Sequence, residues 1–175
     1  MSLSLYQFSV PVFEGSLAAF LGVLDKAEAH AEARKFDATN YLALRLAPDM
    51  FPLTRQVQTF CDHAKNASFR LAGAQPPVIA DDEMTFAELR ARIGTTLNHL
   101  KTIDAGAVDA GADRDIVFPI GPKLKMRMQG PDYLMHFAFP NFYFHLTTAY
   151  DILRSAGVEV GKRDFLGNIP RISPV

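Results

Sequence analysis

The sequence predicts an all-α fold: a four-helix bundle with one short β-hairpin between its third and fourth helices. Apolar residues recur every three or four positions in four separate stretches, which is the spacing of a helix that buries one face. Between Asp115 and Met128 the spacing changes to two, as in a strand with one buried face. A chain of 175 residues is long enough for a substantial core, so we expect a single domain over residues 1–175.

The first helix is expected between about residue 3 and residue 35. Pro11 is tolerated only near the start of a helix or at a kink, so residues 3–10 are predicted to form a lead-in turn. Beyond Leu24 the sequence is rich in alanine and charge, which indicates an exposed helical end and places His30 at the surface. The apolar stripe of this helix consists of Phe13, Leu17, Phe20, Leu21 and Leu24.

Pro48 and Pro52 bracket the entry to the second helix, and Gly73 is well placed as its C-terminal cap. The helix is expected to end at residue 71 or 72. Residues 74–83 contain two adjacent prolines and three acids, so they are predicted to be a surface loop. The apolar stripe of the second helix consists of Val57, Phe60, Ala64, Ala67 and Leu71.

The third helix is expected to start at a capping box, Thr85-Phe86-Ala87-Glu88. His99 falls off its apolar stripe and is predicted to be solvated. The pattern fades near Ile103, and residues 104–115 are rich in glycine, alanine and aspartate, which indicates a connecting loop. The stripe consists of Phe86, Leu89, Ile93, Leu97 and Leu100.

The hairpin is expected to turn at Gly121-Pro122, with its apolar face on the body of the domain and a basic face outward. The basic face consists of Lys123, Lys125 and Arg127. These cations could bind an acidic ligand or partner, or they could protect an exposed strand edge from aggregation. The apolar face consists of Ile116, Phe118, Ile120, Leu124, Met126 and Met128.

The fourth helix is predicted to open at Gly130-Pro131 and to end at Gly157, followed by an extended strap over residues 158–175. Its inner stripe carries two polar side chains, Asn141 and His145, one helical turn apart. The expected stripe consists of Leu134, Phe137, Ala138, Asn141, His145, Thr148 and Ile152.

One polar cluster, His63, Asn141 and His145, is predicted as a ligand pocket between the second and fourth helices. His63 lies beside the apolar stripe of the second helix, so the three side chains have a route to meet. A buried polar group left unpaired costs about 1–3 kcal/mol, so each of them needs a partner or a function. His136 precedes His145 by nine residues, which puts it on the opposite helix face and outside the cluster.

Charge and cysteine usage narrow the classes of function. The formal net charge is −1, so no strong global field favours nucleic acid or a membrane, and neither is an expected partner. Cys61 is the single cysteine, and on a helix its side chain diverges from His63, which favours a core residue over a nucleophile. The N-terminus lacks the basic start and long apolar stretch of a signal peptide, and no apolar run reaches about 18 residues. A cytoplasmic location is expected.

Three segments carry a family resemblance: YQFSVPVF at residues 6–13, RLAPDMFP at residues 45–52 and PNFYFH at residues 140–145. Residues 154–157 and 162–167 extend it along nearly the whole chain. Together they resemble the bacterial family known as domain of unknown function nineteen ninety-three, which is grouped with the DinB-like proteins. The resemblance implies a four-helix bundle that is often dimeric. Many DinB-like proteins bind a divalent metal through one histidine on the second helix and a His-x-x-x-His pair on the last.

In this resemblance His63 takes the place of the second-helix histidine, and His145 that of the later member of the pair. Asn141 stands where the earlier histidine would be. An amide is a weak, neutral ligand, and two imidazoles alone rarely hold zinc or nickel tightly. The resemblance therefore implies at most a weakly bound zinc or nickel ion at His63 and His145.

Two functions from different classes follow, and the sequence leaves open whether the protein is an enzyme. The cluster is either a pocket for a small molecule, or a satisfied polar network, without a tightly held metal. The alternative, implied by DinB-like relatives that act with low-molecular-weight thiols, is a metal-dependent transferase or isomerase that uses His63 and His145. Nucleic-acid binding through Lys123, Lys125 and Arg127 is disfavoured by the charge balance.

A homodimer is predicted from the aromatic exterior of the fourth helix. Phe142, Tyr143 and Phe144 are consecutive, so they point in three directions and do not all face one core. Tyr143 points about 160° away from His145, on the outer side of the helix. Such an aromatic surface is better explained by a subunit contact, or by the C-terminal strap, than by water.

Overall fold

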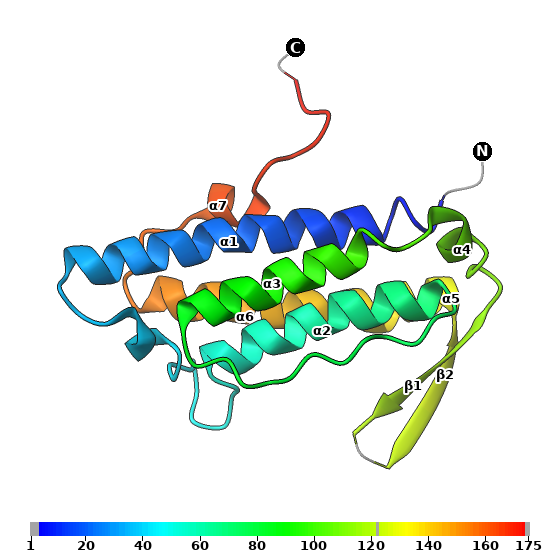
Figure 1. Ribbon diagram of the computed structural model, residues 1–175, viewed down its shortest axis with the longest axis horizontal. Helices are drawn as coiled ribbons and strands as arrows, with labels where there is room; N and C mark the ends of the chain where they lie inside the picture. Colours follow the sequence, from blue (N-terminus) through cyan, green and yellow to red (C-terminus); the bar gives the residue numbers. More distant parts are fainter. Residues whose placement is uncertain (1–3, 122, 174–175) are drawn as a thin grey trace.

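The structure, a computed structural model, describes residues 4–121 and 123–173. It is mostly helical with one two-stranded antiparallel sheet, which confirms the coarse prediction. Four long helices lie side by side, and the hairpin projects from one end of them (Figure 1). The long helices are α1 (Val10–Ala33), α2 (Leu53–Leu71), α3 (Phe86–Leu100) and α6 (Phe139–Ser155).

The helix starts follow the predicted signals. Turns precede α1, which begins at Val10 with Pro11 in its first turn. The Thr85 hydroxyl accepts a hydrogen bond from the Glu88 N–H at 3.2 Å, and the Glu88 carboxylate accepts one from the Met84 N–H at 2.7 Å. The capping box therefore satisfies N–H groups on both sides of the start of α3.

Five short elements complete the fold: η1 (Ala38–Tyr41), α4 (Ala105–Asp109), α5 (Gly130–Tyr133), η2 (Leu134–Ala138) and α7 (Lys162–Leu166). α5, η2 and α6 follow one another without a break, so the predicted fourth helix is present, with a π-helical segment, η2, inside it. The prediction of a plain loop over residues 104–115 is wrong in part. The Asp104 side chain accepts a hydrogen bond from the Ala107 N–H at 2.7 Å and caps α4.

Aromatic rings from three of the long helices meet in the core. Phe13 of α1 packs edge-on against Phe142 of α6 at 4.9 Å between ring centroids, and Phe60 of α2 lies 6.2 Å from Phe142. Phe20 packs against Phe60 at 5.0 Å. Burying one such side chain contributes about 1.5–3 kcal/mol. Phe142 thus connects α6 to the aromatic rings of α1 and α2 in the core.

The predicted inner stripe of the fourth helix is displaced. Asn141 and His145 are half-buried at the edge of the helix that faces α2, while Phe142 and Leu146 are buried. The π-helical segment explains the shift, because its turns hold more residues than an α-helical turn and rotate the following face. The buried residues of η2 and α6 are Leu134, Ala138, Phe142, Leu146, Thr148, Ala149, Ile152 and Leu153.

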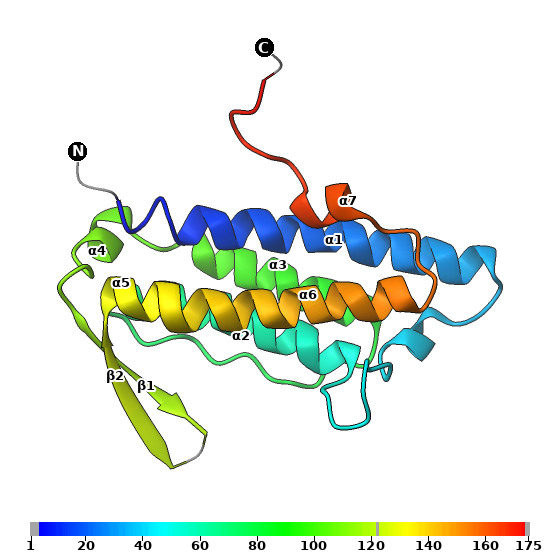
Figure 2. The same ribbon diagram turned by 180° about the vertical axis from the view of Figure 1, so that it is seen from behind.

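The hairpin consists of β1 (Asp115–Ile120) and β2 (Leu124–Gln129), paired so that Phe118 lies opposite Met126. Its base packs on the helices, with the Phe118 ring 4.4 Å from that of Phe137. The far end extends away from the helices, as Figures 1 and 2 show, and leaves Leu124 62% exposed. The expectation that the whole apolar face packs on the body is therefore wrong for the far end of the hairpin, where Ile120, Leu124 and Met126 are exposed, and is met at its base. Pro122, expected in the turn, lies outside the described residues.

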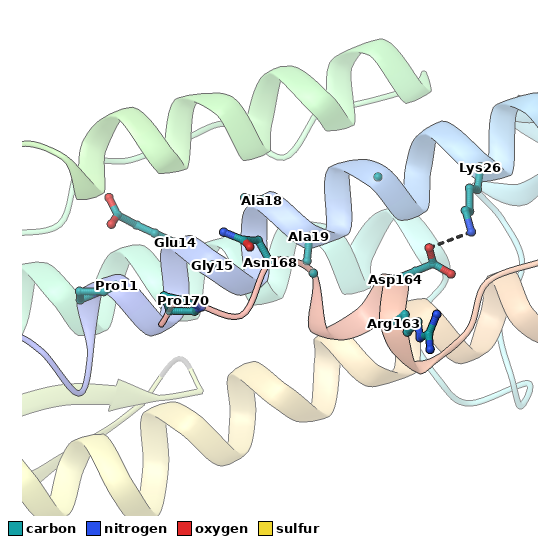
Figure 3. Close-up of a pocket in the computed structure, with 12 residues that line it drawn as sticks. Pro11, Glu14, Gly15, Ala18, Ala19, Lys26, Arg163, Asp164, Asn168 and Pro170 are labelled. Carbon is teal, nitrogen blue, oxygen red and sulfur yellow. Dashed lines mark ion pairs between the residues drawn. The ribbon is translucent and has the colours of Figure 1, made fainter. Parts of the chain in front are cut away.

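The C-terminal segment contains α7, which packs against α1, rather than an extended strap alone. The Lys26 ammonium and the Asp164 carboxylate join them at 2.8 Å. Residues 167–170 still lie beside α1 (Figure 3), and the chain then leads away from the helices (Figure 2). Within residues 4–121 and 123–173, no helix is long and apolar enough to cross a membrane.

Two histidines expected at the surface are half-buried instead. His30 forms a 2.6 Å hydrogen bond between Nδ1 and the hydroxyl of the buried Tyr41. The ring of His99 lies edge-on to Phe69, 6.2 Å away. The apolar stripes of α1 and α3 do not predict this burial, because it comes from other elements. η1 covers His30, and α2 covers His99.

Candidate functional site

His63 of α2 and His145 of α6 lie side by side between their two helices. Their rings are nearly parallel, at 12°, with centroids 5.7 Å apart. Phe51, just before α2, stacks on His145 at 6.2 Å and 17°. Phe137 packs edge-on against His63 at 6.0 Å. Two imidazoles are thus held within an aromatic column, which fixes the planes of both rings.

Gln56 sets the protonation pattern of His145. Its Oε1 lies 2.7 Å from Nδ1 of His145, and its Nε2 donates to the Phe51 carbonyl at 3.1 Å. Because the NH₂ group is used on that carbonyl, only the amide oxygen faces the imidazole, so Nδ1 must carry the proton. The lone pair of neutral His145 is therefore on Nε2.

Gln56 did not emerge from sequence reasoning, although a signal was present. It is 1% exposed and precedes His63 by seven residues, two turns along α2, which puts both side chains on the same helix face. A glutamine next to Val57, at the start of an apolar stripe, has to find a partner once it is buried. His145, 89 residues away in the sequence, is that partner.

Both imidazoles are neutral near pH 7. Burial, followed by repulsion from a charged His145 and from Arg70, lowers the pKa of His63 from 6.5 to about 4. Burial, followed by the nearby Arg55 guanidinium, also lowers the pKa of His145. The pair therefore offers lone pairs rather than positive charge.

Asn141 lies one turn before His145, but its side chain forms a hydrogen bond with the backbone of its own helix. Its Nδ2 donates to the Phe137 carbonyl at 2.7 Å, next to the end of the π-helical segment. Across the described part of the chain, no hydrogen bond joins Asn141 to either imidazole. The structure therefore brings two of the three predicted residues into contact and leaves the third beside them.

A cavity of about 230 Å³ opens next to His145. One wall is the loop before α2, which is held by hydrogen bonds from the Leu53 N–H to the Leu44 carbonyl at 2.9 Å and from the Met50 N–H to the Ala47 carbonyl at 3.0 Å. The other wall comes from α2 and α6. The lining residues are Asp49, Met50, Phe51, Gln56, Phe144 and His145.

Residues 5–166 match the family described as Domain of unknown function (DUF1993). The chain belongs to this family. The crystal structure of a DinB family member protein from Shewanella denitrificans is also similar, with a TM-score of 0.88 and 42% sequence identity over 97% of this chain and 96% of that chain. Both findings confirm the resemblance that the sequence predicts. No curated protein matches.

A larger cavity of this DUF1993 chain, about 720 Å³, lies elsewhere. It runs between α1 and the C-terminal segment (Figure 3). Small residues, Gly15 and Ala18 among them, line its floor, and the Lys26–Asp164 ion pair lies at one end. It shares no lining residue with the cavity at His145.

The remaining candidates stay outside the site. Cys61 is fully buried, and burial raises the pKa of its thiol to about 12, so a core role is the better interpretation. His136 is exposed. Within the two described stretches of chain, no group of three or more histidine, cysteine, aspartate or glutamate side chains is arranged to hold a metal ion.

A buried ionic network was missed from the sequence. The Arg92 side chain is fully buried on α3 and pairs with Glu83 and Asp81 at 2.9 Å each, and with Asp62 at 3.2 Å. Gln58 Nε2 donates to the second Glu83 oxygen at 2.8 Å. Asp81 and Glu83, two of the three acids predicted to lie on a surface loop over residues 74–83, therefore tie that connection to α2 and α3. Glu83 itself is buried, so the prediction of a plain surface loop is wrong there.

Proposed function

We propose that the protein binds a small molecule in the cavity beside His145 and does not hold a metal ion tightly. The observation that carries the proposal is the Gln56–His145 hydrogen bond, which leaves the Nε2 lone pair available in the residue that lines the cavity. A largely apolar wall with one oriented polar group is typical of small-molecule sites.

The chemistry of the nitrogen and oxygen ligands supports the proposal that no metal ion is held tightly. Zinc sites in proteins use three or four ligands, commonly with thiolate or carboxylate charge. Here two neutral imidazoles lie beside the amide of Asn141, whose oxygen is a neutral and weak ligand. These residues do not fit a tightly held divalent ion, and no chemical step is assigned to one.

The second candidate function is a metal-dependent transferase or isomerase of the kind known among thiol-using DinB-like proteins. One observation favours it. A histidine that binds a metal through Nε2 usually donates its Nδ1–H to a neighbouring acceptor, as His145 does to Gln56. Metal analysis of protein purified without a histidine tag separates the candidates. One equivalent of zinc or nickel retained through dialysis would favour the enzyme and overturn the proposal.

A fragment screen tests the proposed pocket. Small fragments are added to protein labelled with ¹⁵N in its histidine rings, and the ring signals of His145 are followed by NMR. We expect several fragments to shift His145 and to leave the exposed His136 unchanged. Met50→Trp, which narrows the cavity, should abolish the shifts, whereas Met84→Trp at a position 74% exposed should not. A screen in which no fragment moves His145 would contradict the pocket.

We also propose that the four long helices form a DinB-type four-helix bundle and that the protein is a cytoplasmic homodimer. A second, apolar hollow of about 510 Å³ supports the dimer, with Phe8 50% and Met135 54% exposed at its edge. Tyr143 lines this hollow and also a second one, which is formed with Phe165 and Ile169 of the C-terminal segment. A partner subunit could therefore cover one side of Tyr143, and the C-terminal segment covers the other.

A further inference from the structure

We propose that the ligand of the His145 cavity is a small organic cation. This inference rests on the proposed function, since it names the chemical class that the same cavity selects. Among the lining residues one side chain, Asp49, carries a formal charge, and that charge is negative. No lysine or arginine lines the cavity.

Aromatic faces strengthen the preference for positive charge. Phe51 and Phe144 line the cavity and are 48% and 57% exposed. Phe51 already stacks on His145, so Phe144 offers the freer ring to a ligand. A cation over such a ring is attracted by the negative charge on the ring face, and the polarisable thioether of Met50 adds a compatible contact. The guanidinium of Arg55 already lies 5.8 Å from the Phe51 ring centroid, which shows that this ring accepts a cation.

The polar floor of the cavity matches a donor rather than an acceptor. Nε2 of His145 carries a lone pair, and Gln56 has both of its amide groups engaged, with His145 and with the Phe51 carbonyl. The acceptor that His145 can offer to a ligand O–H or N–H is therefore Nε2, and the Asp49 charge repels a carboxylate or phosphate.

Arg55 does not reverse this balance. Its guanidinium is paired with Asp81 and donates to Gln58 Oε1 at 3.2 Å, on the side of α2 that faces the Arg92 network. Arg55 is thus paired within the protein, and its remaining effect on the cavity is the lowered pKa of His145. Asp49 forms no ion pair in the described residues.

The size of the cavity limits the ligand. The cavity measures about 230 Å³. This is smaller than the sites that enclose drug-sized ligands, about 300–1,000 Å³. A compact ammonium compound with one hydroxyl or N–H group fits this volume.

The test compares choline with its neutral carbon isostere, 3,3-dimethylbutan-1-ol, and with the anion pivalate. Each is titrated into the full-length protein while the His145 ring signals are followed by NMR. We expect choline to bind about tenfold more tightly than the alcohol. Asp49→Asn should weaken choline about fivefold and leave the alcohol unchanged. Asp82→Asn, at an exposed acid outside the cavity, should change neither.

The outcomes separate the two proposals. If the alcohol or pivalate binds as tightly as choline, the cavity is a site but the cation class is wrong. If choline binds equally to the wild type and to Asp49→Asn, the charge selection is also overturned. If none of the three probes moves His145, and the fragment screen is equally negative, the proposed function fails together with the ligand class.

Discussion

Nδ1 of His145 and Oε1 of Gln56 lie 2.7 Å apart, joining α6 to α2 at the floor of the cavity. This hydrogen bond orients a neutral imidazole so that its lone pair is available to a ligand. Gln56 also satisfies two polar groups at once, because its Oε1 accepts from His145 and its Nε2 donates to the Phe51 carbonyl. The same contact therefore contributes to stability and to the proposed site.

Gln56→Leu tests the stabilising part of this contact. The substitution leaves Nδ1–H of His145 and the Phe51 carbonyl without their partner, so we expect the free energy of unfolding to fall by about 1–3 kcal/mol. Gln7→Leu, at an exposed position before α1, is the matched control and should change stability by less than about 0.5 kcal/mol. Urea unfolding measures both. Equal stability of the two variants would show that the Gln56 contact is not formed.

Stability should fall as the pH is lowered from 6.5 to 4. Burial depresses the pKa of His63 to about 4 from 6.5, so in this window the unfolded chain binds a proton that the folded protein refuses. One such group gives a slope of up to about 1.4 kcal/mol per pH unit. His145 on α6, whose pKa is also lowered, adds to this pH dependence of stability. Arg70, on the same helix as His63, contributes to the lowered pKa of His63.

His63→Gln separates this effect from general acid denaturation. The variant should lose most of the His63 part of the slope, whereas His136→Gln, at an exposed position, should keep it. Urea unfolding at several pH values between 4 and 7 provides the comparison. A slope unchanged by His63→Gln would mean that His63 titrates normally in the folded protein.

Asn141→His should create a metal site. The new imidazole would stand one turn before His145 on the helix edge that faces His63, completing three nitrogen donors. We expect zinc or nickel affinity to rise at least about 100-fold, measured by competition with a chromophoric chelator. Adding His63→Gln to the variant should remove the gain. If Asn141→His binds metal no better than the wild type, the three side chains do not converge.

The Arg92 network should carry far more stability than a surface ion pair. Arg92→Leu leaves the buried Glu83 without its cation, which costs about 3–5 kcal/mol when a buried pair is broken. Arg127→Leu removes the exposed pair with Asp115 and should cost less than about 1 kcal/mol. Urea unfolding measures both, and limited proteolysis of residues 74–85 should accelerate only in Arg92→Leu. Comparable losses in the two variants would contradict the structural role of the network.

The apolar hollow beside Tyr143 makes the dimer testable. Light scattering of the wild type at micromolar concentration should give the mass of two chains. Met135→Lys places a charge at the edge of this hollow and should yield monomer, whereas Met84→Lys, at an exposed position on the α2–α3 connection, should stay dimeric. A wild type that is monomeric throughout would leave the C-terminal segment as the cover of Tyr143.

Periodicity predicted the helices well, because their apolar spacing and capping signals are local. It misplaced the centre of the fourth helix, since the π-helical segment rotates Phe142 into the core and moves His145 to the edge. Apolar spacing does not mark such a segment. Pairings that depend on tertiary contacts were also missed. Arg92 meets Glu83 and Gln56 meets His145 only after distant segments pack.

The ring nitrogens of His145 provide the most direct measurement. In a long-range ¹H–¹⁵N spectrum of the free protein at pH 7, we predict a protonated Nδ1 and an unprotonated Nε2, as the Gln56 contact requires. A bound small molecule should shift the Nε2 signal and leave Nδ1 in place. An imidazolium pattern, a protonated Nε2, or a metal-bound Nε2 in protein as purified would contradict a metal-free pocket with an available lone pair at His145.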